Sequence, residues 1–74
     1  MPVLDVKATG ANIKTIIKAK GFKIADIQDK CGFATPQAIF KWFRGDCVPT
    51  IDNMIIIADM CGVTIDNIIV TRTV

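Results

Sequence analysis

Residues 22–45 read FKIADIQDKCGFATPQAIFKWFRG, and this stretch decides the fold. In its first half Ile24, Ile27 and Cys31 are three and four residues apart, which places them on one face of a helix. Gly32 then ends the helix, because glycine adopts the left-handed conformation of a helix cap at little steric cost. The first half therefore predicts a short amphipathic helix followed by a tight turn.

The second half predicts another helix, which begins directly after the turn. Thr35 is a good N-cap, and Pro36 fits the first helical position because its missing N–H would have no partner there. Ile39 and Trp42 then fall on one face, with Phe43 beside them. The other sides of the helix carry Gln37, Phe40, Lys41 and Arg44. One face can therefore pack while another is free to contact a partner.

Positive charge is concentrated in the first part of the chain. Residues 1–44 carry eight Lys or Arg and three Asp, a formal charge of +5, whereas residues 45–74 carry one Arg and four Asp, a charge of −3. A polyanion is therefore expected to meet the amino-terminal part. The alternative is that the lysines only keep ordinary helix faces solvated, as scattered lysines commonly do.

Three more helices are predicted around this helix pair. An upstream helix ends at Gly21 and has a stripe of apolar residues, namely Ile13, Ile16 and Ile17. Downstream, Thr50 caps a fourth helix that ends at Gly62. The inward stripe of this helix consists of Ile51, Met54, Ile57, Ala58 and Cys61. A fifth, short helix runs from Thr64 to about Ile69.

The two ends of the chain differ from the helical middle. Residues 2–7 and 69–74 carry β-branched residues in partial alternation, as short strands do. These segments can pair with each other, pair with a second chain, or remain disordered tails. The prediction for residues 1–74 is therefore one compact all-α domain of five helices, with a core over about 10–69 and with or without short extended ends.

Three segments follow one another at fixed offsets: CGF at 31–33, TPQAIFKWFRG at 35–45 and VPTIDNM at 48–54. In these residues the chain resembles the Cro/lambda-repressor-type helix-turn-helix family of transcriptional regulators, also described as xenobiotic response element-like. The resemblance combines several offsets, which makes it more specific than a single motif. It implies a lambda-repressor-like fold, a helix-turn-helix unit at about 23–44, and a sequence-specific regulator, such as a small repressor, that binds double-stranded DNA in the major groove.

Two residues depart from the pattern of that family. Ile24 occupies the place of a Gln that usually bonds a DNA phosphate, and Phe43 replaces a common Glu. The interval from Gly32 to Gly45 is also one residue longer than usual. These departures bear on the geometry of the turn and on the register of the contacts with DNA.

By this resemblance, the second helix of the pair contacts the bases. The expected base-reading residues are Thr35, Gln37, Phe40 and Lys41. Gln37 can form two hydrogen bonds to adenine, Lys41 can donate to guanine, and Phe40 can contact a thymine methyl. Two alternatives stay open, namely that Thr35 serves only as the cap and that the Phe40 ring packs into the core.

Phosphate contacts are assigned to other cations near the helix pair. Arg44 and Lys23 are expected to hold DNA phosphates, assisted by backbone N–H groups at the helix start. Trp42 is instead assigned to the core.

The fourth helix has apolar residues in excess of its inward stripe. Ile56 and Met60 are four residues apart and project nearly opposite that stripe, so we expect them to line a homodimer interface. The alternative is that the fifth helix or the carboxyl-terminal tail covers them within one chain. A twofold dimer can place two helices in successive major grooves of a palindromic site. A different class of function is also open, because a protein-interaction module such as an antitoxin-like partner can use the same scaffold and the same apolar surface.

Catalysis, metals and cofactors are not indicated. The chain has no His, Glu or Tyr and no glycine-rich phosphate loop, so the usual catalytic groupings cannot be assembled and we expect no enzyme. Cys31, Cys47 and Cys61 form no CxxC pair, which argues against a disulfide framework or a zinc site and favours buried, reduced thiols. No apolar run approaches the roughly eighteen residues that span a membrane, and no leader pattern begins the chain, so we expect a soluble cytoplasmic protein.

Overall fold

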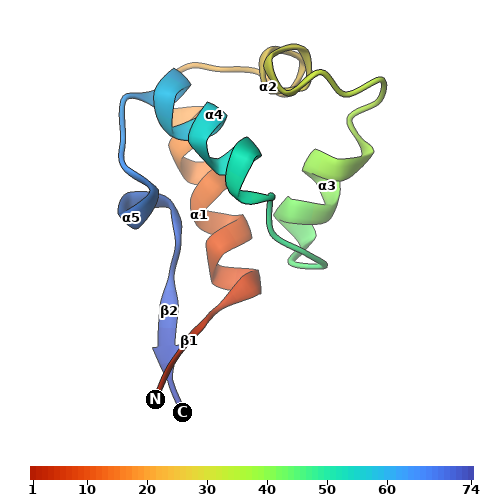
Figure 1. The fold of residues 1–74 in the computed structure, drawn as a ribbon. Helices are drawn as coiled ribbons and strands as arrows, with labels where there is room; N and C mark the ends of the chain where they lie inside the picture. Colours follow the sequence, from red (N-terminus) through yellow and green to blue (C-terminus); the bar gives the residue numbers. More distant parts are fainter.

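Five helices lie between two short terminal strands in the computed structural model, which describes residues 1–74 (Figure 1). The helices are α1 (Val6–Ala19), α2 (Ile24–Cys31), α3 (Gln37–Arg44), α4 (Ile51–Cys61) and α5 (Ile65–Ile68). The strands are β1 (Pro2–Leu4) and β2 (Thr71–Thr73). The prediction of an all-α domain of five helices is therefore confirmed, and the extended ends exist. No helix combines the length and the apolar character that crossing a membrane requires.

One apolar core joins all five helices. Its nine buried residues are Ile13 and Ile17 of α1, Ile27 of α2, Ile39 and Trp42 of α3, Ile57, Ala58 and Cys61 of α4, and Ile68 of α5. Helix α1 packs against α3 and α5, while α2 packs against α3 and α4. The apolar stripes predicted for α1, α2 and α3 are confirmed, because each helix contributes residues of its stripe to this core. The other stripe residues are partly buried and pack against the core, namely Ile16, Ile24, Cys31 and Phe43. Helix α3 is thus held on one face only, which leaves its opposite face open.

Helix ends follow from the expected capping residues in most places. The Thr50 hydroxyl accepts a hydrogen bond from the Asn53 N–H at 3.3 Å, and the Thr64 hydroxyl does the same for the Asn67 N–H at 3.3 Å. Gly32 has a φ of 72°, in the left-handed region that ends α2. The predicted starts of α4 and α5 are therefore confirmed.

Two predictions are wrong, one about an element boundary and one about the direction of a side chain. Val6 and Lys7 belong to α1 and not to a strand, because the Asp5 carboxylate accepts the Ala8 N–H at 2.9 Å and starts the helix there. Ile51 was predicted to face inward, but it is 65% exposed. It is the first residue of α4, and the buried residues of this helix begin only at Met54.

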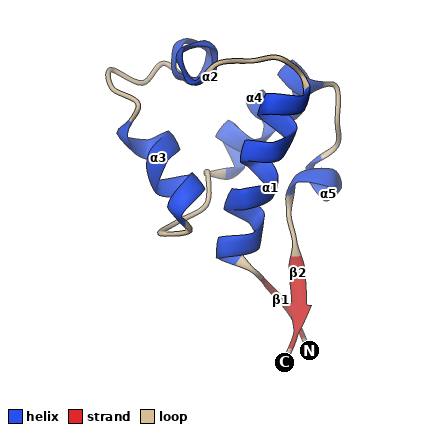
Figure 2. Ribbon diagram, turned by 180° about the vertical axis from the view of Figure 1, so that it is seen from behind, coloured by secondary structure: helices blue, strands red, loops and turns tan.

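Strands β1 and β2 pair with each other, which confirms one of the three alternatives for the chain ends. The two strands lie side by side in the ribbon (Figure 2). Their pairing is antiparallel and places Val3 opposite Arg72. Hydrogen bonds fix the ribbon to the start of α1: the Val70 N–H donates to the buried Thr9 hydroxyl at 2.9 Å, and the Asp5 N–H donates to the Val70 carbonyl at 2.8 Å. The ribbon therefore projects from the end of the fold opposite α2 (Figure 1).

Candidate nucleic-acid interface

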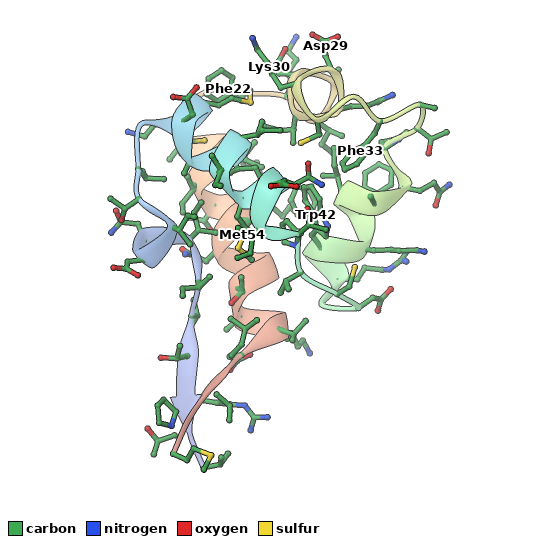
Figure 3. The ribbon with its side chains drawn as sticks, viewed as in Figure 1. Phe22, Asp29, Lys30, Phe33, Trp42 and Met54 are labelled. Carbon is green, nitrogen blue, oxygen red and sulfur yellow. The ribbon has the colours of Figure 1, made fainter.

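The turn between α2 and α3 is held against the core. The Phe33 ring meets the Trp42 ring edge to face, with ring centroids 5.8 Å apart and an interplanar angle of 64° (Figure 3). The Gln28 side-chain amide donates to the Phe33 carbonyl at 3.3 Å. Because one turn residue contacts both α2 and α3, the orientation of α3 relative to α2 is fixed by packing as well as by the chain.

The start of α3 differs from the prediction. The helix begins at Gln37, Pro36 occupies the N-cap position, and no side chain caps the helix. The expectation that Thr35 is the N-cap is therefore wrong. The chain enters the helix one residue later, with the Phe40 N–H donating to the Pro36 carbonyl at 3.1 Å, so Thr35 stays exposed in the turn. Its hydroxyl has no capping task and is available to a ligand.

One face of α3 is buried and the other is open. Ile39 and Trp42 belong to the core, whereas four residues predicted to contact DNA are exposed, namely Gln37, Phe40, Lys41 and Arg44. The Phe40 side chain is 39% exposed, so the alternative that its ring packs into the core is wrong. The open face combines an amide, an ammonium, a guanidinium and an aromatic ring within one eight-residue helix. These are groups that can contact base edges and phosphates.

Three of the expected base-reading residues line one surface depression. Thr35, Gln37 and Lys41 lie around it, together with Phe33, Ala34, Ala38 and Cys47. Phe40 does not line this depression, because it lies on a different side of the exposed face of α3. Cys47 was predicted to be a buried thiol, but it is exposed and lines this depression, which the sequence did not indicate. Cys47 lies in the loop after α3, where the sequence has no helical periodicity from which its exposure could be predicted.

The expected phosphate contacts have different surroundings. Arg44 binds Asp46, with its Nε and Nη2 atoms 3.0 and 2.9 Å from the Asp46 Oδ2, and both side chains are more than half exposed. Lys23 is the N-cap residue of α2, and its exposed side chain lies beside another recess, away from the Thr35 depression. The structure therefore does not bring Lys23 and Arg44 together with the base-reading residues in one pocket.

Apolar residues of α4 form a groove with the connection between α1 and α2. Ile56 and Met60 are half-buried and line this groove with Phe22 and the 52% exposed Ile55. Lys30 and Asp59 lie on its edge. Figure 3 shows Phe22 and Lys30 at the α2 end of the molecule. Sequence periodicity found Ile56 and Met60 but not Phe22, which lies outside any helix.

The three thiols differ in environment. All are free, with Cys61 buried, Cys31 half-buried and Cys47 exposed. Burial raises the pKa of the Cys31 thiol, and burial also raises the pKa of the Cys61 thiol against a smaller opposing effect of Lys20. The two packed cysteines therefore stay protonated at neutral pH and react slowly.

A helix packed on one face, a tight turn and a second helix with a polar open face define a helix-turn-helix protein. The sequence matches the helix-turn-helix family model over residues 13–68, and the chain belongs to this family of Cro/C1-type proteins. None of the curated proteins compared with the chain matches it. The fold is similar to the crystal structure of the DNA-binding domain of BldD, with a TM-score of 0.70, 21% identity, and coverage of 89% of this chain and 94% of that chain. Family membership supports a DNA-binding regulator as the class of function.

Proposed function

We propose that the protein is a sequence-specific, double-stranded DNA-binding regulator, a small repressor that places α3 in the major groove as a homodimer. The observation that carries this proposal is the polar row of α3, in which Gln37, Lys41 and Arg44 are exposed while Ile39 and Trp42 anchor the opposite face. All five helices share one core, so residues 1–74 are proposed to act as a single domain.

Base reading is assigned to Thr35, Gln37, Phe40 and Lys41. The Gln37 amide matches the donor and acceptor of adenine, and the Lys41 ammonium matches the two acceptors of guanine. The exposed Phe40 ring suits a thymine methyl, and the Thr35 hydroxyl can pair with either kind of base edge. The open depression that Thr35, Gln37 and Lys41 share supports their joint role.

Phosphate binding is assigned to Arg44 and Lys23. A free α-helix start leaves backbone N–H groups without partners, and α3 has no side-chain cap to satisfy them. These N–H groups favour a phosphate at the same end, as helix starts do for anions generally. Arg44 is bound to Asp46, but it can bind a phosphate of the more strongly charged DNA backbone instead. Breaking an exposed ion pair costs little free energy.

The homodimer is proposed to form through the α4 groove, with Ile56 and Met60 at its centre. Two features support a second copy as the occupant. The groove presents exposed Ile55 and half-buried Phe22 beside these residues, and an apolar surface of this kind is stabilised by being covered. The groove also carries one cation and one anion, Lys30 and Asp59, so that a twofold copy can set each charge against its opposite.

Sedimentation of variants tests the dimer. Ile56→Asp with Met60→Asp should convert the dimer to monomer at micromolar concentration, since it places charges in the proposed interface. Ile55→Asp is a second variant at a half-exposed position, where folding is not at stake. Ile51→Asp is the matched control, because Ile51 is exposed on α4 but does not line the groove. Unchanged association of the folded groove variants would remove these residues from the interface.

A protein-interaction module, such as an antitoxin-like partner, is the second candidate. The same groove of Phe22, Ile55, Ile56 and Met60 favours it, because a partner helix can occupy an apolar groove as well as a second copy can. Ile24 also favours it, since it offers no hydrogen bond to a phosphate.

A DNA-binding regulator must lie in the compartment that holds its operator DNA. We propose that this compartment is the cytoplasm, as expected from the sequence.

Salt dependence of duplex binding tests the DNA-binding role. Fluorescence anisotropy of a labelled duplex should show affinity that falls steeply as salt rises, because each phosphate contact releases bound counterions. Lys41→Ala should reduce the binding free energy by about 1 to 3 kcal/mol, and the loss should depend on the base at one position of the site. Arg72→Ala is the control, because it removes the same charge from β2 and should leave base preference unchanged. Absence of binding even at low salt would favour the protein-interaction role.

A further inference from the structure

A second group of positive charges surrounds a recess between α1, the start of α2 and α3. The recess has a volume of about 200 Å³ and is lined by Lys14, Lys18, Lys23, Ile17, Phe22, Ile24 and Phe43. Its floor is apolar and its polar lining comes from the three lysines, which are all exposed. No carboxylate lines the recess.

These lysines have no acidic partner. The salt bridge of the structure joins Arg44 to Asp46, and it leaves the lysines unpaired. Asp26, three residues after Lys23, accepts the Lys23 backbone N–H at 2.8 Å as part of the α2 cap. The Lys14 ammonium lies 5.8 Å from the centroid of the Phe43 ring, a contact that positions a cation without neutralising it. Three like charges around one recess repel each other, so an anion that contacts all three is favoured.

The recess lies beside the open face of α3. Phe43 lines it, and Phe43 lies three residues after the exposed Phe40 and next to Arg44 in the same helix. Residues three apart in a helix are neighbours on its surface, so the lysines border the DNA-contacting face on the Phe40 side. Lys14 and Lys18 are four residues apart in α1, about 6 Å along its axis.

We propose that Lys14 and Lys18, together with Lys23, form a phosphate clamp that holds the DNA backbone beside the groove contacted by α3. The ligand is the run of phosphates on one strand, which presents a charge about every 3.4 Å of the duplex axis. The clamp rests on the proposed DNA-binding function and adds α1 to the interface. It contributes affinity and orientation and carries no base preference, because phosphates carry no sequence information.

A pair of charge-matched double variants tests the clamp. Lys14→Gln with Lys18→Gln removes two charges at exposed positions on α1, and Lys20→Gln with Arg72→Gln removes two charges from positions outside the recess. Affinity for a duplex is measured against salt for both variants and for the unmodified chain. For each lost contact, the slope of log K against log salt should become less steep by about 0.9 in the clamp variant. The affinity should fall about tenfold per contact near 0.1 M salt. Its ranking of duplex sequences should not change.

The outcomes separate the clamp from the function on which it rests. If the unmodified chain binds DNA and the clamp variant keeps its slope and affinity, the clamp is wrong and the DNA-binding function stands. Equal losses in both double variants would also overturn the clamp, because they would report net charge alone. If the unmodified chain binds no duplex, the proposed function fails and the clamp fails with it. Circular dichroism and urea unfolding of each variant confirm that the losses arise in a folded protein.

Discussion

A β-carbon built on Gly10 would lie 1.8 Å from the backbone carbonyl oxygen of Trp42. Helix α1 therefore meets the backbone of α3 at a residue that has no side chain, and Gly10 is buried there. This contact sets how far α3 stands from the rest of the core. Since the Trp42 backbone belongs to the helix with the open face, the same contact positions that face.

Gly10→Ala should be strongly destabilising. An isolated helix gains about 1 kcal/mol from this change, but here the added methyl collides with backbone, so we expect a net loss of about 3 kcal/mol or more in the free energy of unfolding. Gly21→Ala is the control, because no atom lies within 4 Å of its added β-carbon and only its φ of 77° is strained. That strain costs about 1 to 2 kcal/mol. Urea unfolding measures the stability of both variants. If Gly10→Ala lowers the free energy of unfolding no more than Gly21→Ala does, the close packing of α1 on α3 is contradicted.

Thr9→Val should loosen the terminal ribbon. The buried Thr9 hydroxyl accepts the Val70 N–H at 2.9 Å, and a valine would leave this donor without a partner. The free energy of unfolding should fall by about 1 to 3 kcal/mol, and the Val70 amide hydrogen should exchange faster. Thr15→Val is the matched control on the exposed side of α1, where the hydroxyl only bonds the Ala11 carbonyl, and it should change stability by less than about 0.5 kcal/mol. Unaltered Val70 exchange in the Thr9 variant would show that the hydroxyl does not hold the ribbon.

Asp46→Asn should strengthen DNA binding. Asp46 holds the Arg44 guanidinium at 2.9 Å, so removing the Asp46 charge frees that guanidinium to bind a phosphate. Because exposed ion pairs contribute at most about 1 kcal/mol, the gain should be about two- to fivefold and equal for all duplex sequences. Arg44→Ala should weaken binding and abolish the gain in the double variant. A gain that persists without Arg44 would show that the ion pair is not the cause.

Alkylation should distinguish the three thiols. Exposed Cys47 should react first with N-ethylmaleimide at neutral pH, whereas burial raises the pKa of Cys31 and Cys61, so their reactive thiolates form only when the pH rises above the ordinary thiol range. Mass spectrometry after one equivalent locates the adduct. Because Cys47 lines the depression with Gln37 and Lys41, the adduct should weaken DNA binding about tenfold or more. Cys47→Ser should bind normally and resist inhibition, and full affinity of the Cys47 adduct would place the depression outside the interface.

The helices and most of their ends were predictable, because the information that sets them is local. Apolar residues three and four apart marked the faces that became buried, as at Ile27 and Ile57. Thr50 and Thr64 marked two helix starts by the same local hydrogen bonds that the structure contains. The exposed face of α3 followed directly, since burial of Trp42 leaves Lys41 outside.

Features that depend on how helices meet were not predictable from periodicity. Gly10 in mid-helix signals only a weak helix former, and its approach to Trp42 exists only once α1 and α3 have packed. The Arg44 and Asp46 pair forms across the turn at Gly45, where no helical spacing applies. The failure at Thr35 has a different, local origin, because Pro36 occupies the cap position itself.

Selection of bound duplexes from a randomised DNA pool, at low salt and at near-physiological salt, tests the central claim most directly. The account predicts enrichment of a twofold-symmetric site whose half-sites lie about 34 Å apart, one helical turn, and weaker enrichment at the matching base position for Lys41→Ala than for the unmodified chain. Binding without enrichment of any sequence, or no binding at either salt concentration, would contradict base reading by α3 and shift the function to contact with a protein partner.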